Sequence, residues 1–232
     1  MKIEMFNVGW FTAPSGLLRA GDDMDEPMRY PVPAYLIETG SERILIDTGL
    51  HPESPQAIEP FVLEHELSIA DQVDLTTLTK VVLTHLHFDH AGALALVPEK
   101  VPLVVQRAEW TAGHDDAQVE RNFYRPPDYG GTDRPVELVE GDHDLLGDGS
   151  VLLLLTPGHT PGHQSVQIGD LVLGIDVAHF ASGLDDHRFP LFGDDHSAQG
   201  RSAERLKALR DDGHTVLPGH DPEVLRPGRL PT

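Results

Sequence analysis

The sequence predicts a mixed α/β fold in which sheets pack against one another. Along 232 residues, short apolar runs of β type alternate with loops and with a few segments of helical spacing. The 22 glycines and 19 prolines are spread along the chain as turn signals rather than pooled in one disordered block. Five of the apolar runs are each followed within a few residues by an aspartate or a histidine. That placement is typical of layered α/β folds, in which strand ends hold ligand-binding side chains at fixed separations.

The first part of the chain contains a segment without a clear periodic pattern. Residues 12–31 are rich in Pro, Gly and Asp, and their apolar side chains are Leu17, Leu18, Met24 and Met28. We predict an irregular lid or loop over this segment. The chain is long enough for one generous domain and too short for two, so residues 1–232 are predicted to form a single domain.

Five strand-like runs each end next to a side chain that can bind a metal. The runs and the residues that follow them are 43–46 before Asp47, 81–84 before His85, 151–155 before His159, 171–175 before Asp176 and 215–217 before His220. Chance would not favour one end of every strand in this way. We therefore expect these side chains to gather at one site.

Three helices are predicted between the strands. The clearest covers residues 198–212, where apolar residues recur at helical spacing between a capping Ser197 and a terminating Gly213. A second helix is predicted over residues 89–95 and a third over residues 106–110.

Composition excludes several classes of protein. The formal net charge of −21 repels nucleic acid and anionic membrane surfaces, which are bound mainly through Lys and Arg. The absence of cysteine excludes disulfide scaffolds, thiolate metal sites and cysteine nucleophiles. No apolar run approaches the roughly 20 residues of a spanning helix, and the N-terminus lacks the apolar stretch of a signal peptide. We expect a cytoplasmic protein that acts on a small molecule.

The segment His85-x-His87-x-Asp89-His90 is the sharpest signal in the sequence, which has 14 histidines in all. Two histidines two positions apart at the end of a strand point the same way, so both imidazoles can meet one cation. Asp89 and His90 lie at the turn into the predicted helix, where they can diverge toward a second cation. Neutral imidazole and carboxylate suit Zn²⁺ and its first-row neighbours.

At this point the sequence resembles the metallo-β-lactamase-fold hydrolases, and among them most closely the bacterial N-acyl-homoserine lactonases, which are quorum-quenching enzymes. The resemblance covers the chain from about Val32 to Asp221. Its strongest motifs are Thr84–Gly92, Thr156–His163, Gly174–Asp176 and Pro218–Asp221. Supporting segments are Pro33–Thr39, Ile46–Gly49, Val104–Glu109, Leu138–Asp142 and His163–Ser165.

The resemblance implies a four-layer αββα sandwich with a dinuclear metal site at the strand ends. It implies that one cation is held by His85, His87 and His159, and the other by Asp89, His90 and His220. Asp176 would bridge the two cations, because a carboxylate has two oxygens to offer. We expect zinc, with iron, cobalt or manganese as alternatives.

Further roles are predicted for the residues around these ligands. Asp47 is expected to orient ligands by hydrogen bonding, whereas His163 is either orienting or merely structural. The other histidines are expected to be solvated surface residues, for example His51, His65, His114, His143 and His214. Candidates for an apolar substrate pocket are Phe88, the apolar residues of segment 12–31, Trp10 and Phe11.

The predicted reaction is hydrolytic opening of the lactone ring of an N-acyl-homoserine lactone by a hydroxide that bridges the two metal ions. Asp89 would carry a proton to the leaving oxygen. The chain departs from the lactonase pattern at one position, because His179 stands where these enzymes place a tyrosine three residues after the bridging aspartate. We predict that His179 takes over the role of that tyrosine as hydrogen-bond donor to the carbonyl oxygen.

Other functions remain open from sequence. The alternatives are hydrolysis of another lactone, ester or thioester, as in a pyridoxolactonase or a glyoxalase II, and a non-catalytic metal-binding sensor. The short stretch after His220 disfavours the glyoxalase, which adds a C-terminal helical region. The sequence leaves open whether the protein is a monomer or a homodimer.

Overall fold

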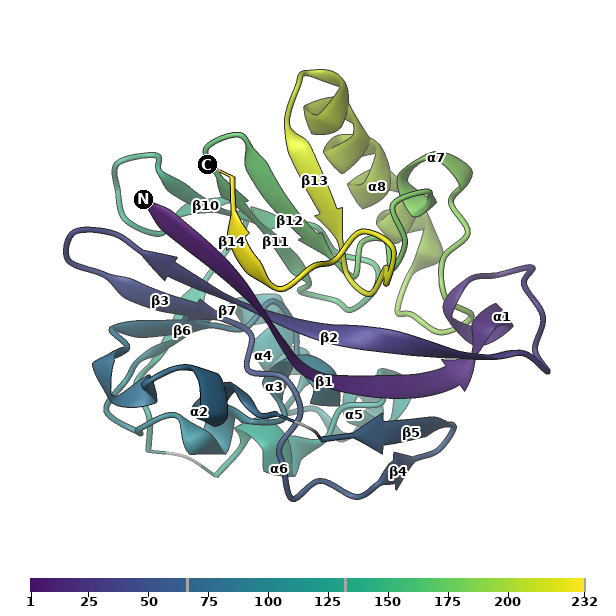
Figure 1. Cartoon of the computed structure of the whole chain (residues 1–232), viewed down its shortest axis with the longest axis horizontal. Helices are drawn as coiled ribbons and strands as arrows, with labels where there is room; N and C mark the ends of the chain where they lie inside the picture. Colours follow the sequence, from purple (N-terminus) through teal and green to yellow (C-terminus); the bar gives the residue numbers. More distant parts are fainter. Residues whose placement is uncertain (66, 132, 232) are drawn as a thin grey trace.

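The structure is a computed structural model that describes residues 1–65, 67–131 and 133–231. Within these residues, two sheets pack face to face (Figure 1). The first holds nine strands in the order β4-β5-β1-β2-β3-β6-β7-β8, with β14 paired to β1. The second holds five strands in the order β13-β12-β11-β10-β9. No described helix is long and apolar enough to cross a membrane.

The strands are short except for the first two. Those of the first sheet are β1 (Lys2–Pro14), β2 (Pro27–Glu38), β3 (Arg43–Ile46), β4 (Ala57–Ile58), β5 (Phe61–Glu64), β6 (Lys80–Val82), β7 (Leu103–Gln106), β8 (Val136–Val139) and β14 (Gly228–Leu230). Those of the second sheet are β9 (His143–Asp144), β10 (Val151–Leu155), β11 (Gln164–Ile168), β12 (Leu171–Ile175) and β13 (Thr215–Pro218). The five predicted strands are therefore β3, β6, β10, β12 and β13.

Helices cover the outer faces of the two sheets. They are α1 (Ser15–Leu18), α2 (Ile69–Gln72), α3 (Phe88–Ala91), α4 (Arg107–Ala112), α5 (Asp116–Arg121), α6 (Pro126–Tyr129), α7 (Gly183–Asp186) and α8 (His196–Asp211), with 3₁₀ turns η1 (Leu75–Thr77) and η2 (Leu94–Leu96). Helices α2 to α6 lie on the outer side of the first sheet, whereas α7 and α8 lie on the side of the second (Figure 1).

The alternation of side chains along each strand builds the layers. On β3, Ile44 and Ile46 enter the apolar cluster between the sheets, to which the second sheet contributes Leu153 and Val166. Leu45, between them, points to the opposite face and joins the cluster under the helices. Successive side chains of a strand point to opposite faces, so a run such as Arg43–Ile46 serves two cores at once. The predicted αββα fold is confirmed.

The C-terminal helix was predicted well apart from its cap. α8 begins at His196 because the Asp195 side chain accepts hydrogen bonds from the backbone N–H groups of Ser197 and Ala198 at 2.8 and 3.0 Å. The cap is therefore Asp195 and not Ser197. The helix ends before Gly213, whose φ of 104° is accessible to glycine.

The helix predicted over residues 89–95 is interrupted in the structure. α3 ends at Ala91 and η2 begins at Leu94. Between them the backbone N–H of Ala93 donates to the carbonyl of Gly49 at 2.9 Å, so the chain leaves the helix to join the loop after β3. A Cβ on Gly92 would lie 2.9 Å from that same carbonyl oxygen, which explains the glycine. The third predicted helix is α4.

The segment 12–31 is more regular than predicted. β1 and β2 form one long antiparallel arm from Lys2 paired with Glu38 to Pro14 paired with Pro27, with a shift of register between Asn7 and Trp10, and α1 lies at its tip. Of the prolines that suggested a loop, Pro14 ends β1 and Pro27 begins β2, where proline is tolerated, and Pro31 lies within β2. The prediction of an irregular segment was wrong for the paired residues, while its role as a lid stays a prediction.

Candidate metal centre

The predicted ligands lie together where the carboxyl ends of strands from both sheets meet. His85 and His87 follow β6, and His159 follows β10. Asp176 follows β12 directly, and His220 follows β13. These side chains are all buried. The loops that carry them come from opposite sheets, so the site lies across one end of the sandwich.

A first group brings together His85, His87, His159 and Asp176, whose ligand atoms lie within 4.8 Å of one another. His87 Nδ1 is 3.1 Å from His85 Nε2 and 3.0 Å from His159 Nε2. His159 Nε2 is 3.3 Å from Asp176 Oδ2. Three imidazole nitrogens and one carboxylate oxygen thus converge on one small volume.

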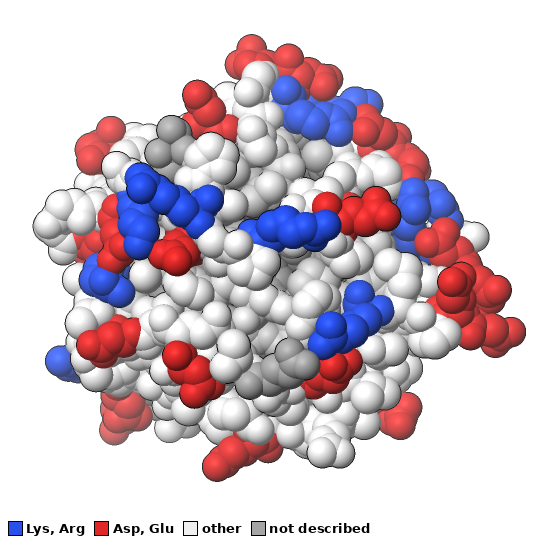
Figure 2. All heavy atoms as spheres, viewed as in Figure 1, with Lys and Arg blue, Asp and Glu red and all other residues white. Residues whose placement is uncertain are grey.

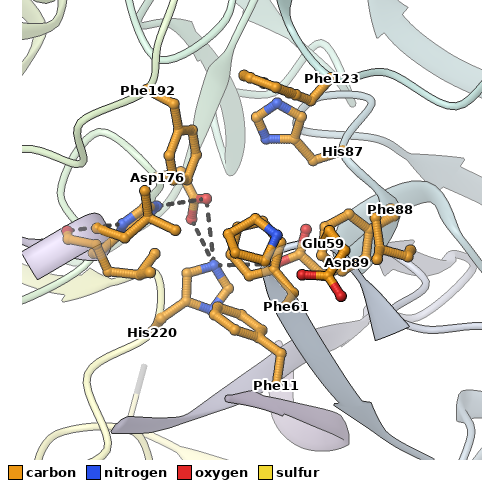
Figure 3. A pocket seen from close by; sticks show the side chains of 15 residues that line it. Phe11, Glu59, Phe61, His87, Phe88, Asp89, Phe123, Asp176, Phe192 and His220 are labelled. Atoms are coloured by element: carbon orange, nitrogen blue, oxygen red, sulfur yellow. Dashed lines mark hydrogen bonds and ion pairs between the residues drawn. The ribbon is translucent and has the colours of Figure 1, made fainter. Parts of the chain in front are cut away.

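A second group consists of Asp89, His90 and His220. His220 Nε2 lies 3.4 Å from Asp89 Oδ2 and 3.2 Å from Asp176 Oδ1. His90 Nε2 lies 3.6 Å from both Asp89 Oδ2 and Asp176 Oδ2. Asp176 therefore stands between the two groups, next to His220 in the close view of the site (Figure 3).

The outer nitrogens of these imidazoles show which nitrogen faces the centre. His87 Nε2 lies 2.8 Å from the carbonyl of Asn122, and His220 Nδ1 lies 2.9 Å from the carbonyl of Pro31. His90 Nδ1 lies 2.8 Å from Asp47 Oδ2. Carbonyl and carboxylate oxygens only accept, so in each ring the outer nitrogen carries the hydrogen and the inner one has a lone pair when the ring is neutral.

The site therefore fits metal ions on the chemistry of its own donors. Lone pairs of histidines and carboxylate oxygens face one another, and both His90 Nε2 and Asp176 Oδ1 are buried without a hydrogen-bond partner among the described residues. Burial lowers the pKa of His87 and of His159 to about 3, so these imidazoles are in the neutral form that binds metal. Donor sets of nitrogen and oxygen are typical of zinc and its first-row neighbours.

Carboxylates raise the pKa of the histidines in the second group. Burial alone lowers the pKa of His220, but the charges of Asp176 and Asp89 outweigh it and raise that pKa above its usual value. The same carboxylates, with Asp47, raise the pKa of His90 against the effect of burial. The negative charge that holds a proton there also attracts a cation.

Asp47 orients the second group, as predicted. Its Oδ2 accepts hydrogen bonds from His90 Nδ1 and from the Thr84 hydroxyl at 2.8 and 2.7 Å, and its Oδ1 accepts one from the Thr84 N–H at 2.8 Å. Its φ of 58° is left-handed, an uncommon conformation for a residue other than glycine. The hydrogen bonds hold the carboxylate in this position behind His90.

His163 forms a hydrogen bond with the backbone N–H of Asp176. The buried imidazole accepts a hydrogen bond from the Asp176 N–H on Nε2 at 3.2 Å, while Nδ1 lies 3.1 Å from the Thr156 carbonyl. Ile175, just before, has a left-handed φ of 51°, and such strain in a β-branched residue is typical of functional sites. Gly219 leaves room for the carboxylate, because a Cβ there would lie 2.2 Å from Asp176 Oδ1.

His179 lies beside Asp176 at the edge of the centre. Its Nε2 is 3.0 Å from Asp176 Oδ2, and its Nδ1 is 3.4 Å from the carbonyl of Leu18. The shorter contact places the ring hydrogen on Nε2, because a carboxylate oxygen accepts. Its ligand atom also lies within 4.8 Å of those of Asp176 and His220. His179 is thus a buried N–H donor that faces the ligands.

An apolar cavity of about 130 Å³ opens onto the centre (Figure 3). Its wall contains four side chains that were candidates from sequence, namely Phe11, Leu17, Leu18 and Phe88. The other candidates lie elsewhere. Met24 is exposed, Met28 packs against the core under the helices, and the Trp10 ring lies 3.9 Å from the Arg29 guanidinium.

Three phenylalanines of the cavity were not predicted. Phe61 begins β5, Phe123 follows α5, and Phe192 lies between α7 and α8. The Phe192 ring is 6.3 Å from that of Phe123 and 6.1 Å from that of Phe61. No periodic pattern in the sequence links three positions so far apart, so only the fold reveals them.

The five histidines expected at the surface vary in exposure. His114 is exposed, while His51, His143 and His214 are partly buried. His65 departs from the prediction, because both of its ring nitrogens are buried and burial lowers its pKa. His65 lies outside both ligand groups.

Comparison with known proteins identifies similar sequences and structures. The family model described as the metallo-beta-lactamase superfamily matches residues 28–220. An N-acyl homoserine lactonase of a Bacillus species is 32% identical over 224 residues, which cover 87% of this chain and 85% of that protein. The N-acyl homoserine lactonase AiiA of Bacillus thuringiensis subsp. kurstaki is 31% identical, over 88% of this chain and 86% of that protein.

Solved structures give the same picture. A quorum-quenching N-acyl homoserine lactone hydrolase superposes with a TM-score of 0.82 at 27% identity, over 96% of this chain and 93% of that one. A second structure, of an N-acyl homoserine lactone hydrolase with the product N-hexanoyl-L-homoserine bound at its catalytic metal centre, has a TM-score of 0.81 at 25% identity. It covers 96% of this chain and 94% of that one.

Proposed function

Because the chain belongs to the metallo-β-lactamase superfamily, and within it to the family of the N-acyl homoserine lactonases, we propose that it is a metal-dependent hydrolase that opens the lactone ring of N-acyl-homoserine lactones. One observation carries this proposal. Two groups of metal-binding side chains meet on Asp176, and an apolar cavity opens directly onto them. Hydrolysis of such lactones would make the protein a quorum-quenching enzyme.

The proposed ligands follow the two groups in the structure. His85, His87 and His159 would hold one cation. Asp89, His90 and His220 would hold the other, with Asp176 shared between them. We propose Zn²⁺ as the resident ion, with iron, cobalt and manganese also compatible with these donors. When bound, two such cations supply an acidified water as nucleophile and polarise the ester carbonyl.

Asp89 is proposed to move the proton that ring opening requires. Its side chain lines the cavity and is almost fully buried. Opening of the lactone breaks the bond between the acyl carbon and the ring oxygen, which leaves as an alkoxide and must gain a proton. A carboxylate at the wall of the cavity can accept a proton from the attacking water and pass it to that oxygen.

His179 is proposed to donate a hydrogen bond to the carbonyl oxygen of the scissile ester. Its Nε2 hydrogen faces Asp176 Oδ2 at 3.0 Å, and the side chain lines the cavity. We propose that this hydrogen would turn to the substrate when Asp176 holds the cations. Charge builds on the carbonyl oxygen as the tetrahedral intermediate forms, so a donor fixed at that point stabilises the transition state more than the ground state. In this chain the imidazole N–H would do the work of a tyrosine hydroxyl.

The phenylalanine wall is proposed to bind the acyl chain. Phe11, Phe61, Phe88, Phe123 and Phe192 come from five different segments and all face the cavity. Removal of apolar surface from water contributes about 25 cal/mol per Å². An acyl chain placed against these rings would position the lactone over the centre.

A panel of lactones tests the proposed function. Ring opening releases acid, so a pH indicator follows hydrolysis of acyl-homoserine lactones, simple γ-lactones and thioesters, each with and without a chelator. We expect turnover of the acyl-homoserine lactones that the chelator abolishes. Faster turnover of γ-lactones or thioesters would contradict the substrate assignment. No turnover of any compound by the metal-loaded protein would contradict the hydrolase itself.

Two further points concern the location of the protein and its assembly. We propose a cytoplasmic location, whereas the sequence leaves open whether the protein is a monomer or a homodimer. Cell fractionation checks the first, and light scattering of the purified protein checks the second.

A further inference from the structure

We infer that Glu109 is a positioning residue for one of the two cations, because it ties the turn that carries His85 and His87 to the turn that carries His159. This inference rests on the proposed metal centre. Loss of the Glu109 carboxylate should lower the affinity for the cation held by these three histidines. The affinity for the cation held by Asp89, His90 and His220 should stay nearly unchanged.

Glu109 is an acid in an unusual place. It lies in the first turn of α4 and its side chain is fully buried, although glutamate is almost never fully buried unless it has partners. Burial raises the pKa of this carboxyl group, and the hydrogen bonds that it accepts act in the opposite direction. The reaction proposed above makes no use of it.

Each carboxylate oxygen of Glu109 reaches one of the two turns. Oε1 accepts hydrogen bonds from the backbone N–H of Leu86 at 3.0 Å and from the Tyr124 hydroxyl at 2.7 Å. Oε2 accepts hydrogen bonds from the Thr160 hydroxyl at 2.8 Å and from the backbone N–H of Gly162 at 2.9 Å. Leu86 stands between His85 and His87, and Thr160 follows His159. A single side chain thus sets the separation of three ligands.

The turn after His159 packs tightly against the backbone of α4. A Cβ on Gly162 would lie 2.2 Å from the Glu109 backbone nitrogen, so the turn after His159 rests directly on α4. Two of the four donors are backbone N–H groups, which cannot turn into acceptors. A glutamine has one acceptor oxygen, and its NH₂ group would face either the Leu86 or the Gly162 N–H. A buried donor would then be left unsatisfied, and one of the two turns would have to move.

The second group of ligands is supported by other residues. His90 Nδ1 donates to Asp47, and His220 Nδ1 donates to the Pro31 carbonyl. Among the described residues, the hydrogen bonds to the Glu109 carboxylate come instead from Leu86, Tyr124, Thr160 and Gly162. The effect of Glu109 should therefore be selective for the first cation.

The test measures the affinity of each cation rather than activity. Zn²⁺ is removed from the folded protein by a graded series of competing chelators, and bound zinc is counted per chain. His159→Ala and His220→Ala identify which release step belongs to which cation. The matched control is Glu140→Gln, because Glu140 is an exposed acid that pairs with Arg107 at the start of α4 through a contact of 2.6 Å.

We expect Glu109→Gln to lower the zinc affinity of one release step, the one that His159→Ala abolishes, by about 10- to 100-fold. This is the usual effect of removing a residue that supports metal ligands. The step that His220→Ala abolishes should weaken at least fivefold less, and Glu140→Gln should match the wild type. A residue that only stabilises the fold would weaken both steps alike. Equal weakening of both steps, or of neither, would overturn the inference.

Two further results keep the inference separate from the proposed function. Should the wild type bind no zinc, the proposed metal centre itself is wrong. Should Glu109→Gln fail to fold, Tyr124→Phe removes one donor from Oε1 and leaves the ring, whose centroid lies 5.7 Å from that of His87. We expect a smaller weakening at the same step, and wild-type affinity in Tyr124→Phe would overturn the inference.

Discussion

At the scale of single residues, the centre depends on hydrogen-bond acceptors that fix the direction of the imidazoles. Asp47 shows this most clearly, because it accepts three hydrogen bonds and one of them comes from His90. That bond leaves the lone pair of His90 Nε2 facing Asp89 and Asp176. Removing the negative charge of Asp47 should therefore lower the affinity for metal, and any loss of turnover should follow from that.

We predict that Asp47→Asn lowers the affinity for the cation held by Asp89, His90 and His220 by about 10- to 100-fold. The asparagine has one acceptor oxygen in place of two, so a donor from Thr84 or His90 loses its partner. Chelator competition measures the change. Asp148→Asn is the control, because Asp148 is an exposed acid whose side chain accepts hydrogen bonds from Ser150 within its own turn. Unchanged affinity in Asp47→Asn would refute this role.

We predict that His179→Phe lowers kcat/KM for the preferred lactone by about 10²-fold, the usual effect of removing one donor to the carbonyl oxygen. Phenylalanine fills similar space but has no N–H. Zinc content, measured in parallel, should stay at the wild-type value if His179 acts on substrate. A change of less than twofold in kcat/KM would exclude the donor role.

Asp128 gives a prediction on pH that is independent of the metal centre. Burial raises its pKa to about 6, against the opposing effect of the Arg125 charge. A carboxyl group whose pKa is higher in the folded state binds more protons there than in the unfolded state. Its contribution to the free energy of unfolding therefore falls as pH rises from about 4 to about 6.

We predict that Asp128→Asn removes this pH dependence. The melting temperature of the variant, relative to the wild type, should rise between pH 4 and pH 7, as measured by calorimetry on metal-free protein. A difference that stays constant over this range would show that the group titrates normally.

At the scale of elements, loops from distant parts of the chain form the pocket around the ligands. Phe192 lies on the segment between α7 and α8, where the Leu191 N–H donates to the Leu17 carbonyl and the Asp194 N–H donates to the His159 carbonyl at 2.9 and 3.1 Å. Its ring centroid lies 5.9 Å from that of His159 and 6.2 Å from that of His179. This segment therefore places a large ring directly over the centre.

We predict that Phe192→Ala changes the preference for acyl length. The cavity has a volume of about 130 Å³, and loss of the ring would enlarge it beside the ligands. The ratio of kcat/KM for a decanoyl over a butanoyl substrate should rise about tenfold, which corresponds to roughly 1.4 kcal/mol of added apolar contact. Leu191→Ala is the control, because that neighbouring side chain is exposed. An unchanged ratio would place the acyl chain elsewhere.

The elements that could be predicted from sequence are those with a local signal. β3, β6, β10, β12 and β13 each show a short apolar run before an aspartate or a histidine of the centre, and α8 shows helical spacing between a cap and a glycine. The helix predicted over residues 89–95 was too long. The hydrogen bond from Ala93 to Gly49 that ends it joins segments far apart in the chain, so no local pattern shows it.

The supporting residues could not be predicted for the same reason. The four donors to Glu109 come from three separate segments, and only the folded chain brings them together. Phe61, Phe123 and Phe192 are isolated aromatic residues in loops or at the start of a strand. The proposed ligands His85, His87, Asp89 and His90 differ from these, because their chemistry and spacing within Thr84–Gly92 are visible in the sequence itself.

At the scale of the whole molecule, the two sheets bury an apolar cluster, and the ligands close one end of it. The surface has a strong excess of acid. Figure 2 shows Asp and Glu spread over the visible face, with Lys and Arg beside many of them. Ion pairs such as Arg205 with Asp142 neutralise some acids locally, while a net charge of −21 remains over the chain.

We predict that metal removal destabilises the whole fold. Cations that bind only the folded chain stabilise it by mass action, by about 3 kcal/mol when their concentration is 100 times the dissociation constant. For a chain of this length that corresponds to a loss of roughly 5–10 °C in Tm. Calorimetry with and without chelator measures it, and identical melting temperatures would contradict a metal centre whose ligands come from the ends of four strands.

Metal content, measured together with lactone hydrolysis, is the decisive test of the proposed dinuclear centre. Purified protein is analysed for transition metals, stripped with a chelator, and then titrated with Zn²⁺ while turnover of an acyl-homoserine lactone is followed. We predict two ions per chain, loss of turnover on stripping, and recovery that saturates as the second ion binds. Fewer than one ion per chain, with turnover that neither stripping nor zinc changes, would contradict it.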